Sequence, residues 1–205
     1  MFSRELGPSA NTLKLQTVYS GLIAAAGLLV LSPAMVLLAI AVRLTSEGPA
    51  LYRQRRMGLN GKVFTLYKFR SMRVDAEQVS GAVWASKEDP RTTPVGRFLR
   101  RSRLDELPQL INVLRGEMSL VGPRPERPEF INTLSERIPF YRQRLCVKPG
   151  ITGWAQINHK YGDTLEDTVS KIEYDLYYIK HLSPALDFFI MFHTIKVMLL
   201  NRGGQ

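Results

Sequence analysis

Cysteine and histidine are scarce in this chain of 205 residues. Cys146 is the single cysteine, so no disulfide can form within one chain, and a reducing compartment is expected. The three histidines, His159, His181 and His193, lack the spacing of a zinc site, and one cysteine cannot complete a common zinc set. The sequence therefore indicates neither a disulfide framework nor a zinc centre.

Two familiar phosphate-binding signatures are also missing. The chain contains neither a Gly-x-Gly-x-x-Gly sequence nor a Walker P-loop. A Rossmann or P-loop nucleotide site is therefore not supported. Any nucleotide must be recognised through another geometry.

Acidic residues are outnumbered, with 18 Asp and Glu against 28 Lys and Arg, which gives a net charge of +10. Such a charge favours an anionic partner: nucleic acid, anionic lipid or a phosphorylated substrate. The basic residues are interleaved with acidic ones and no familiar docking motif is present, so nucleic acid is not the expected partner. The length suffices for one compact domain with a core.

Charge is absent altogether between Lys14 and Arg43. Val18–Val42 contains about a dozen Leu, Ile and Val, each favouring insertion by roughly 0.3 to 0.6 kcal/mol. The segment exceeds the roughly 20 residues needed to cross a bilayer. Basic residues flank both ends, which places both flanks in the cytoplasm. Proline removes a helical hydrogen bond at Ser32-Pro33, so we expect a re-entrant membrane helix broken there, with a spanning helix as the alternative.

Downstream of this segment the pattern predicts a β-hairpin and a short helix. The runs Ala50–Arg56 and Lys62–Phe69 are joined by Gly58-Leu-Asn-Gly61, and Asn-Gly between such runs is a strong hairpin signal. The segment Asp75–Asp89 is polar, with a helical start followed by turns. Val95–Arg101 is expected to form a short basic helix.

An amphipathic helix is predicted next, ending near Gly116. Its apolar positions share the i, i+3, i+4, i+7 spacing of one helix face: Leu107, Leu110, Ile111 and Leu114. This spacing places Asp105 and Glu106 at or just before the N-terminus of the helix.

The C-terminal part of the chain is divided by Pro and Gly. The expected segments are a basic helix over 129–147, a loop or short strand over 153–158, a charged amphipathic helix over 165–182 and an apolar helix over 184–200. The last helix could lie in a membrane interface or pack on the domain, and the interface is slightly favoured.

Three segments of the sequence resemble the bacterial sugar transferase family, the monotopic phosphoglycosyl transferases or polyprenyl-phosphate hexose-1-phosphate transferases. They are Lys68-Phe-Arg-Ser-Met-Arg73, the long run from Asp105-Glu-Leu-Pro-Gln to Gly122-Pro-Arg-Pro125, and Lys148-Pro-Gly-Ile-Thr-Gly-Trp-Ala-Gln156. The resemblance extends from about Lys14 to Leu200. The break at Ser32-Pro33 matches the re-entrant helix of that family.

The resemblance implies a ping-pong reaction with Mg²⁺ as cofactor. An Asp carboxylate attacks the β-phosphate of a UDP-sugar, UMP leaves, and polyprenyl phosphate takes the phosphosugar from the enzyme. Such reactions begin exopolysaccharide, O-antigen or glycoprotein glycan assembly. Many members carry additional N-terminal membrane helices, so this chain is expected to be either a small minimal member or the catalytic domain of a longer protein.

Asp105 is the expected nucleophile and Glu106 its partner. A carboxylate that attacks a phosphoryl group forms an acyl phosphate, and a helix N-terminus stabilises the anion by up to about 1 kcal/mol. Glu106 is assigned to Mg²⁺ binding or to deprotonation of the acceptor phosphate, and both carboxylates are candidate metal ligands. The simpler alternatives are an N-cap for Asp105 and a solvated first-turn carboxylate for Glu106.

The expected substrate-binding residues are mostly basic. Arg124 lies between Pro123 and Pro125, and its planar fork suits phosphate oxygens. Lys68 and Arg70 follow the second hairpin strand and are assigned to phosphate or lipid-headgroup binding.

Arg103 and Gln156 complete the candidate binding residues. Arg103 ends a basic run (Arg97, Arg100, Arg101 and Arg103) that is ordinarily a solvated face, but here it precedes the nucleophile and could steer an anion or touch lipid phosphate. Gln156 and the neighbouring Trp154 could line a sugar or base pocket, and a packed core tryptophan is an equal alternative.

The expected organisation is an N-terminal membrane segment over 1–44 and a small cytoplasmic catalytic domain over 45–205, at the inner membrane of a bacterium. Membrane lipid is an expected partner, and a homo-oligomer is compatible with the sequence. The alternatives to an enzyme are a membrane-tethered basic scaffold and a nucleic-acid-binding protein. A scaffold leaves the Asp105-Glu106 pair and the Gly122–Pro125 segment without a purpose.

Overall fold

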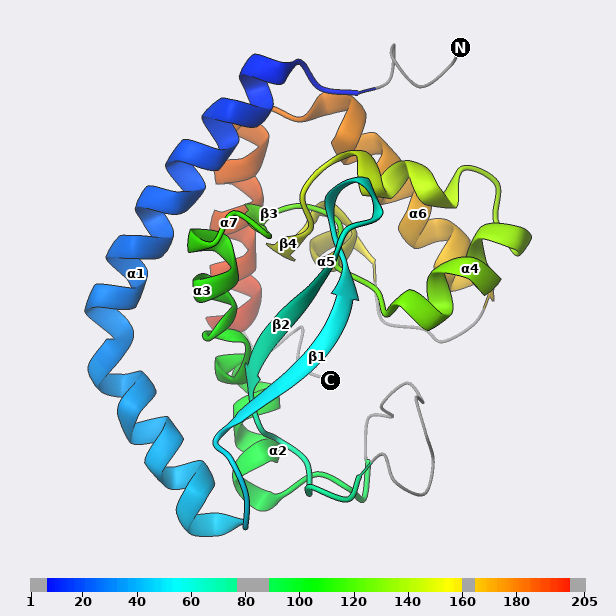
Figure 1. Cartoon of the computed structure of the whole chain (residues 1–205). Helices are drawn as coiled ribbons and strands as arrows, with labels where there is room; N and C mark the ends of the chain where they lie inside the picture. The colour runs from blue at the N-terminus through cyan, green and yellow to red at the C-terminus, as the bar shows by residue number, and fades with distance from the viewer. Residues whose placement is uncertain (1–6, 77–88, 160–164, 200–205) are drawn as a thin grey trace.

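The computed structural model describes residues 7–76, 89–159 and 165–199. Over these residues the chain is mostly helical with two small two-stranded sheets, so the predicted α+β, mostly α, class is confirmed in outline. The long helix α1 lies along one side of the molecule, and the other elements gather against its inner side (Figure 1). The helices are α1 (Ala10–Thr45), α2 (Pro94–Arg101), α3 (Gln109–Leu114), α4 (Pro128–Arg137), α5 (Trp154–Asn158), α6 (Leu165–His181) and α7 (Pro184–Leu199), and the strands are β1 (Leu51–Met57), β2 (Val63–Phe69), β3 (Ser119–Val121) and β4 (Gly150–Thr152).

Helix α1 is, within the described part of the chain, the one helix long and apolar enough to cross a membrane. Ser9 caps its start, since the Ser9 hydroxyl accepts from the Thr12 amide at 3.2 Å. One side of the helix packs on the domain through Ala24 and Val42, which are both fully buried. The opposite side exposes a row of large apolar residues, among them Leu29 at 79%. The helix thus has one face for the domain and one apolar face turned outward.

The expected break of this helix at Ser32-Pro33 is wrong for the backbone, because α1 continues through Pro33 as one helix of 36 residues. Pro33 has no N–H to donate to the carbonyl of Leu29. The Ser32 hydroxyl donates to that carbonyl at 3.0 Å instead and so replaces the missing bond. The helix bends in its middle (Figure 1). The re-entrant path through a membrane stays a prediction.

The predicted hairpin is confirmed. Strands β1 and β2 pair antiparallel, with Leu51 opposite Phe69 at one end and Met57 opposite Val63 at the other. The connecting turn places Asn60 at φ 53° and Gly61 at φ 75°, a left-handed conformation that Asn and Gly adopt with least strain. The polar segment expected over Asp75–Asp89 lies mostly outside the described residues.

Helix α3 is present, but its buried face differs from the predicted one. The buried residues are Gln109, Leu110, Asn112 and Val113, whereas Leu114 is 49% exposed. Asn112 is fully buried because its amide bonds the β2 backbone: it accepts from the Tyr67 amide at 3.1 Å and donates to the Thr65 carbonyl at 2.7 Å. A polar side chain therefore ties α3 to the hairpin, a contact that hydrophobic spacing alone cannot indicate. Gly116 follows the helix at φ 74°, as expected for a C-terminal stop.

Two expectations for the C-terminal half are corrected. The helix expected over 129–147 is divided into α4 and a 3-10 helix over Tyr141–Cys146. Pro139 causes the division, since Ile138 before it is extended at φ −118° and Phe140 after it is left-handed at φ 62°. The loop or strand expected over 153–158 is instead the short helix α5, and the strand β4 precedes it and pairs parallel to β3.

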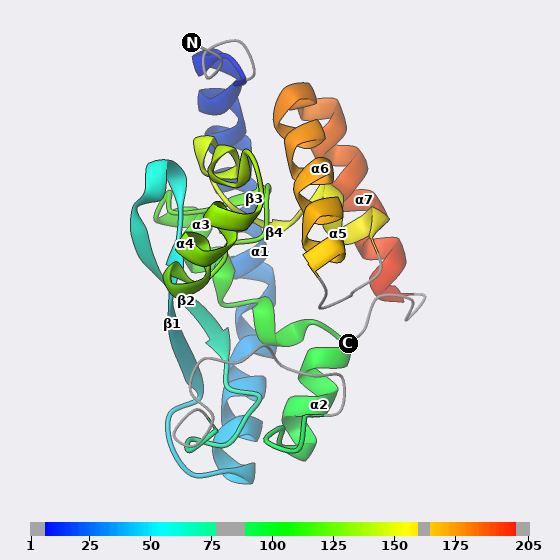
Figure 2. The ribbon, with the colours of Figure 1, turned by 90° about the vertical axis from the view of Figure 1, so that its right-hand side faces the viewer.

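The two predicted C-terminal helices are confirmed as α6 and α7, which follow one another in the chain and diverge from their connection in Figure 1, while they overlap in the view of Figure 2. Both pack into the main hydrophobic core through Tyr178 and Ile190. Helix α7 also exposes Phe188 at 52% and Phe192 at 69%. Its placement at a membrane interface stays a prediction.

Candidate active site

Asp105 and Glu106 occupy a 3-10 helix over Leu104–Glu106, directly before α3. Arg103 opens this turn in the left-handed conformation, at φ 56°. That conformation is uncommon for a residue with a side chain and is concentrated at functional sites. Both carboxylates are buried, at 7% and 8% exposure. The predicted position of the pair at the entry to the helix is therefore confirmed, and burial makes each carboxylate sensitive to its charged neighbours.

Glu106 is held by two cations on one oxygen. Lys68 Nζ and Arg124 Nη2 each lie 2.8 Å from Glu106 Oε1. Burial alone raises the pKa of a carboxyl group, but Arg124 and Lys68 together hold the pKa of Glu106 well below its usual range. Glu106 is therefore ionised at neutral pH, and its charge is compensated by Lys68 from strand β2 and by Arg124 from the loop after β3.

Asp105 differs from Glu106 in its bonding partners and in the direction of its pKa shift. Within the described part of the chain no hydrogen bond or ion pair reaches its carboxylate. Burial raises the pKa of Asp105 to about 6, and the Glu106 anion acts in the same direction, while Lys68, Arg124 and Arg100 oppose the rise. A carboxylate without partners, in a site that does not stabilise its charge fully, is available for reaction.

The loop Pro123–Glu126, which carries Arg124, is fixed through its backbone. Four successive carbonyls each accept a hydrogen bond of 2.8 to 3.0 Å: Pro123 from the Gly150 amide, Arg124 from Arg144, Pro125 from Arg56, and Glu126 from the Met57 amide. Pro123 and Pro125 are themselves buried and restrict the backbone further. The guanidinium of Arg124 thus projects from a backbone that has little freedom to move.

The predicted site residues separate into two groups. Lys68 and Arg124 are brought together on Glu106, with Pro123 and Pro125 supporting Arg124. Arg70 lies elsewhere: it is buried at the end of α1, where Nη2 donates to the Ser46 carbonyl at 2.7 Å and Nη1 to the Glu47 carbonyl. Arg70 therefore caps α1 instead of facing the carboxylate pair.

Gln156 is also not joined to the carboxylate pair by any contact of the described residues. It lies on α5, and its Nε2 donates to the Ile151 carbonyl at 3.3 Å. Trp154 on the same helix stacks on Tyr177, with the two ring centroids 5.7 Å apart, and packs against the core. The structure thus shows Trp154 in a packed environment, and a binding role of Gln156 stays a prediction.

Comparison with known proteins assigns the chain to a family. The model of the bacterial sugar transferase family matches residues 12–201. The chain belongs to this family. The match includes α1, the hairpin, the carboxylate pair and the Arg124 loop, so the whole site described above lies within it.

Curated proteins similar to this chain include two whose names state a sugar-phosphate transfer and one named for exopolysaccharide production. The UDP-N-acetylgalactosamine-undecaprenyl-phosphate N-acetylgalactosaminephosphotransferase of Aeromonas hydrophila is 47% identical over 174 residues, which are 85% of this chain and 41% of that protein. The UDP-glucose:undecaprenyl-phosphate glucose-1-phosphate transferase of Escherichia coli (strain K12) is 47% identical over 179 residues, 86% of this chain and 38% of that protein. The exopolysaccharide production protein PSS of Rhizobium leguminosarum bv. phaseoli is 44% identical over 181 residues, 86% of this chain and 90% of that protein. The chain thus spans less than half of the first two relatives and most of the third.

The carboxylate pair fits a magnesium ion in part. Among the described residues no group of three or more His, Cys, Asp or Glu side chains is placed to hold a metal by itself. Mg²⁺ commonly binds through one or two carboxylates and completes its shell with water and substrate phosphates. Glu106 Oε1 is taken by Lys68 and Arg124, so the Asp105 carboxylate and Glu106 Oε2 are the oxygens that would hold the ion.

Three residues around the loop were not predicted from the sequence: Arg56, Arg144 and Asp175. Arg56 and Arg144 stand in runs rich in arginine, where nothing distinguishes a buried one. Asp175 did carry a signal, because it shares the face of α6 that buries Ile172 and Ile179. A charge on an apolar helix face indicates a buried partner.

Proposed function

We propose that this sugar transferase moves a sugar-1-phosphate from a UDP-sugar to polyprenyl phosphate and releases UMP, through a phosphosugar intermediate on Asp105. The unequal treatment of two adjacent carboxylates is the observation that carries the proposal. Glu106 is held by two cations, whereas the Asp105 carboxylate has no partner among the described residues. The printed names of the relatives support the reaction class.

In the first half-reaction Asp105 attacks the phosphorus that bears the sugar. A bond forms between a carboxylate oxygen and the β-phosphorus, and the bond from that phosphorus to the bridging oxygen breaks, so UMP leaves with the electron pair. The attacking carboxylate has to be ionised, and the pKa of about 6 leaves most of it ionised at neutral pH. Burial removes water that would otherwise stabilise the anion and reduce its reactivity.

In the second half-reaction a phosphate oxygen of polyprenyl phosphate attacks the same phosphorus. The bond to Asp105 breaks, and the carboxylate returns to its ionised form. The product is a polyprenyl diphosphate-sugar. The acceptor is a lipid, and the outward apolar face of α1 supports a position of the site at a membrane surface. The basic residues on both sides of the apolar segment are the reason to propose the cytoplasmic side of a bacterial inner membrane.

Lys68, Glu106 and Arg124 are proposed to act as one electrostatic unit beside the nucleophile. Their two positive charges exceed the single charge of Glu106, so the unit is complementary to a diphosphate. Glu106 is a poor general base, because the two cations hold its pKa low. We therefore assign it to holding Lys68 and Arg124 and to the metal, not to proton removal. A bound Mg²⁺ would neutralise charge on the diphosphate and on the leaving UMP.

The test is UMP release from a panel of UDP-sugars, with undecaprenyl phosphate present and absent. A UDP-sugar that is a substrate should give one UMP per enzyme without acceptor, together with a phosphosugar adduct on Asp105 that mass spectrometry locates. Continuous release should require undecaprenyl phosphate. Turnover that needs both substrates bound at once, with no adduct and no stoichiometric UMP burst, would contradict the covalent route.

A further inference from the structure

We propose that Arg144 and Asp175 are positioning residues for Arg124, and that they fix the backbone from which Arg124 reaches Glu106. The inference rests on the proposed function, since it concerns how a side chain of that same site is held in position. Neither residue contacts the carboxylate pair. Their proposed effect passes through the carbonyl of Arg124 alone.

Arg144 makes the contact that carries this inference. Its Nη2 donates to the Arg124 carbonyl at 2.9 Å and to Asp175 Oδ2 at 2.8 Å. Its Nη1 donates to Tyr141 Oη at 2.9 Å. The side chains of Arg144 and Asp175 are only 7% and 3% exposed. A planar guanidinium held at three points cannot rotate without breaking a buried hydrogen bond.

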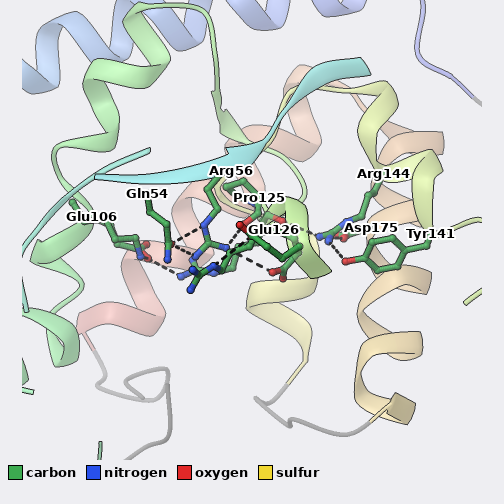
Figure 3. Close-up of polar contacts among 12 residues, drawn as sticks. Gln54, Arg56, Glu106, Pro125, Glu126, Tyr141, Arg144 and Asp175 are labelled. Atoms are coloured by element: carbon green, nitrogen blue, oxygen red, sulfur yellow. Dashed lines mark hydrogen bonds and ion pairs between the residues drawn. The ribbon is translucent and has the colours of Figure 1, made fainter. Parts of the chain in front are cut away.

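The opposite side of the loop is held by Arg56 from strand β1. Arg56 Nη1 donates to the Pro125 carbonyl at 2.8 Å, and Gln54 orients the guanidinium by accepting from its Nε at 2.9 Å. Figure 3 shows the loop between these two arginines, with Glu106 on the Arg56 side and Asp175 and Tyr141 on the Arg144 side. The adjacent carbonyls of Arg124 and Pro125 thus accept hydrogen bonds from two different elements, the 3-10 helix that carries Arg144 and strand β1.

A single residue, Arg124, connects Arg144 to the carboxylate pair. Arg124 is the one residue of the loop whose side chain bonds Glu106, at 2.8 Å, and the same residue offers its carbonyl to Arg144. A shift of the carbonyl moves the Cα of Arg124 and so moves its guanidinium. Displacements of about 1 Å at a positioned group can reduce rates by roughly a hundredfold. A buried ion pair that only stabilised the fold would have no reason to affect the nucleotide-sugar step selectively.

Arg144→Lys tests the inference, because lysine keeps the charge but cannot bond two acceptors with a rigid fork. The readout is kcat/KM for UMP release, measured in the wild-type background and in an Arg124→Ala background. We expect a fall of about tenfold in the wild-type background and less than about twofold with Arg124→Ala, because coupled residues are non-additive. The same fall in both backgrounds, or none in the wild type, overturns the inference.

Matched variants separate positioning from folding. Arg142→Lys makes the same substitution two positions away in the same 3-10 helix, where the side chain is exposed and bonds Asn132 at 3.1 Å, so it should leave UMP release unchanged. Asp175→Asn keeps an oxygen for Arg144 and should show the same dependence on Arg124 with a smaller fall. It takes the place of Arg144→Lys in the cycle if thermal melting shows that the lysine variant does not fold. An Asp175→Asn effect that persists without Arg124 overturns the inference.

The two proposals fail in different ways. If the wild-type chain releases no UMP from any UDP-sugar, the proposed function is wrong and the inference falls with it. If the wild type is active and the Arg124 background leaves the Arg144→Lys effect unchanged, the function stands and the positioning role alone is wrong.

Discussion

Two buried carboxylates in this protein are satisfied in different ways. Glu106, beside the proposed nucleophile, is bound by two cations at 2.8 Å on a single oxygen. Asp187, at the start of α7, is bound by neutral donors: Gln16 at 2.8 Å, Tyr178 at 2.7 Å, and Tyr19. Asp187 is fully buried, so its polar atoms have to be satisfied by the protein.

Under the proposed function, the difference separates a site that acts on a ligand from a site that joins helices. The cations around Glu106 leave a net positive charge that an anionic substrate can use. The neutral donors around Asp187 come from α1 and α6, and Gln16 also donates to the Val121 carbonyl at 3.3 Å. That network attaches α1 to the domain at the strand that leads into the Arg124 loop. In the proposed mechanism, charge therefore serves the reaction at Glu106, whereas hydrogen-bond geometry serves assembly at Asp187.

The largest effect is expected from Asp105→Asn, which removes the proposed nucleophile but keeps the shape of the side chain. UMP release and the phosphosugar adduct should fall by at least about ten-thousandfold, the scale seen when a covalent nucleophile is lost. The folded protein should melt at a higher temperature, because the raised pKa of Asp105 shows that its ionised form is disfavoured on folding at neutral pH. Single-turnover UMP release and thermal melting measure both results. A near-normal rate would remove Asp105 from the mechanism.

Glu106→Gln should have the next largest effect, because it leaves Lys68 and Arg124 without their common anion. We expect kcat to fall by about a hundredfold, as for the loss of one electrostatic contact in an active site. The Mg²⁺ concentration needed for half-maximal rate should rise. Stability should fall by about 1 to 3 kcal/mol, which is less than for a fully buried pair because the Arg124 side chain is 35% exposed. An unchanged Mg²⁺ titration would show that Glu106 does not hold the metal.

The pH dependence of the first half-reaction should report Asp105. Only its ionised form attacks, and its pKa is raised to about 6, so the rate should fall as the pH is lowered through 6. Lys68 lowers the pKa of Asp105, so Lys68→Met should move this acidic limb to higher pH. Burst amplitudes and rates of UMP release between pH 5 and 8, in the absence of acceptor, measure the limb. An acidic limb that stays in place in the Lys68 variant would assign it to another group.

Much of the fold followed from local sequence signals. The Asn-Gly turn predicted the hairpin, and the entry of the helix after Asp105-Glu106 was placed correctly. The errors had two different causes. Ser32 preserves α1 through Pro33 by a local bond to the Leu29 carbonyl in the same helix. Asn112 replaces an apolar residue on the buried face of α3 because β2, distant in the sequence, offers it backbone partners, and such a pairing has no periodic signature.

The candidate site was predictable in its chemistry but not in its division of tasks. The sequence showed two adjacent carboxylates, and from it we expected Arg124 to bind phosphate. It did not indicate that Lys68 and Arg124 meet on Glu106, or that Arg70 caps α1. Lys68 and Arg70 are two residues apart, and only the three-dimensional path of β2 past the carboxylates separates a site residue from a structural one.

The smallest effect is expected from Asp187→Asn, which tests the second carboxylate. Asparagine keeps one oxygen acceptor for Gln16 and Tyr19 at the position of Oδ2, and Tyr178, which bonds Oδ1, can accept from the asparagine amide while donating to the Val121 carbonyl, so UMP release should stay within about twofold of the wild type and stability should change by less than about 1.5 kcal/mol. Asp187→Ala is the matched contrast, since it removes the shared acceptor, leaves Gln16 and Tyr178 to share the Val121 carbonyl, and should cost about 2 to 4 kcal/mol. Thermal unfolding and single-turnover release measure the two variants. If Asp187→Asn instead abolished UMP release while the protein stayed folded, the charge of Asp187 would act in the reaction, and the contrast between a catalytic and an assembling carboxylate would be wrong.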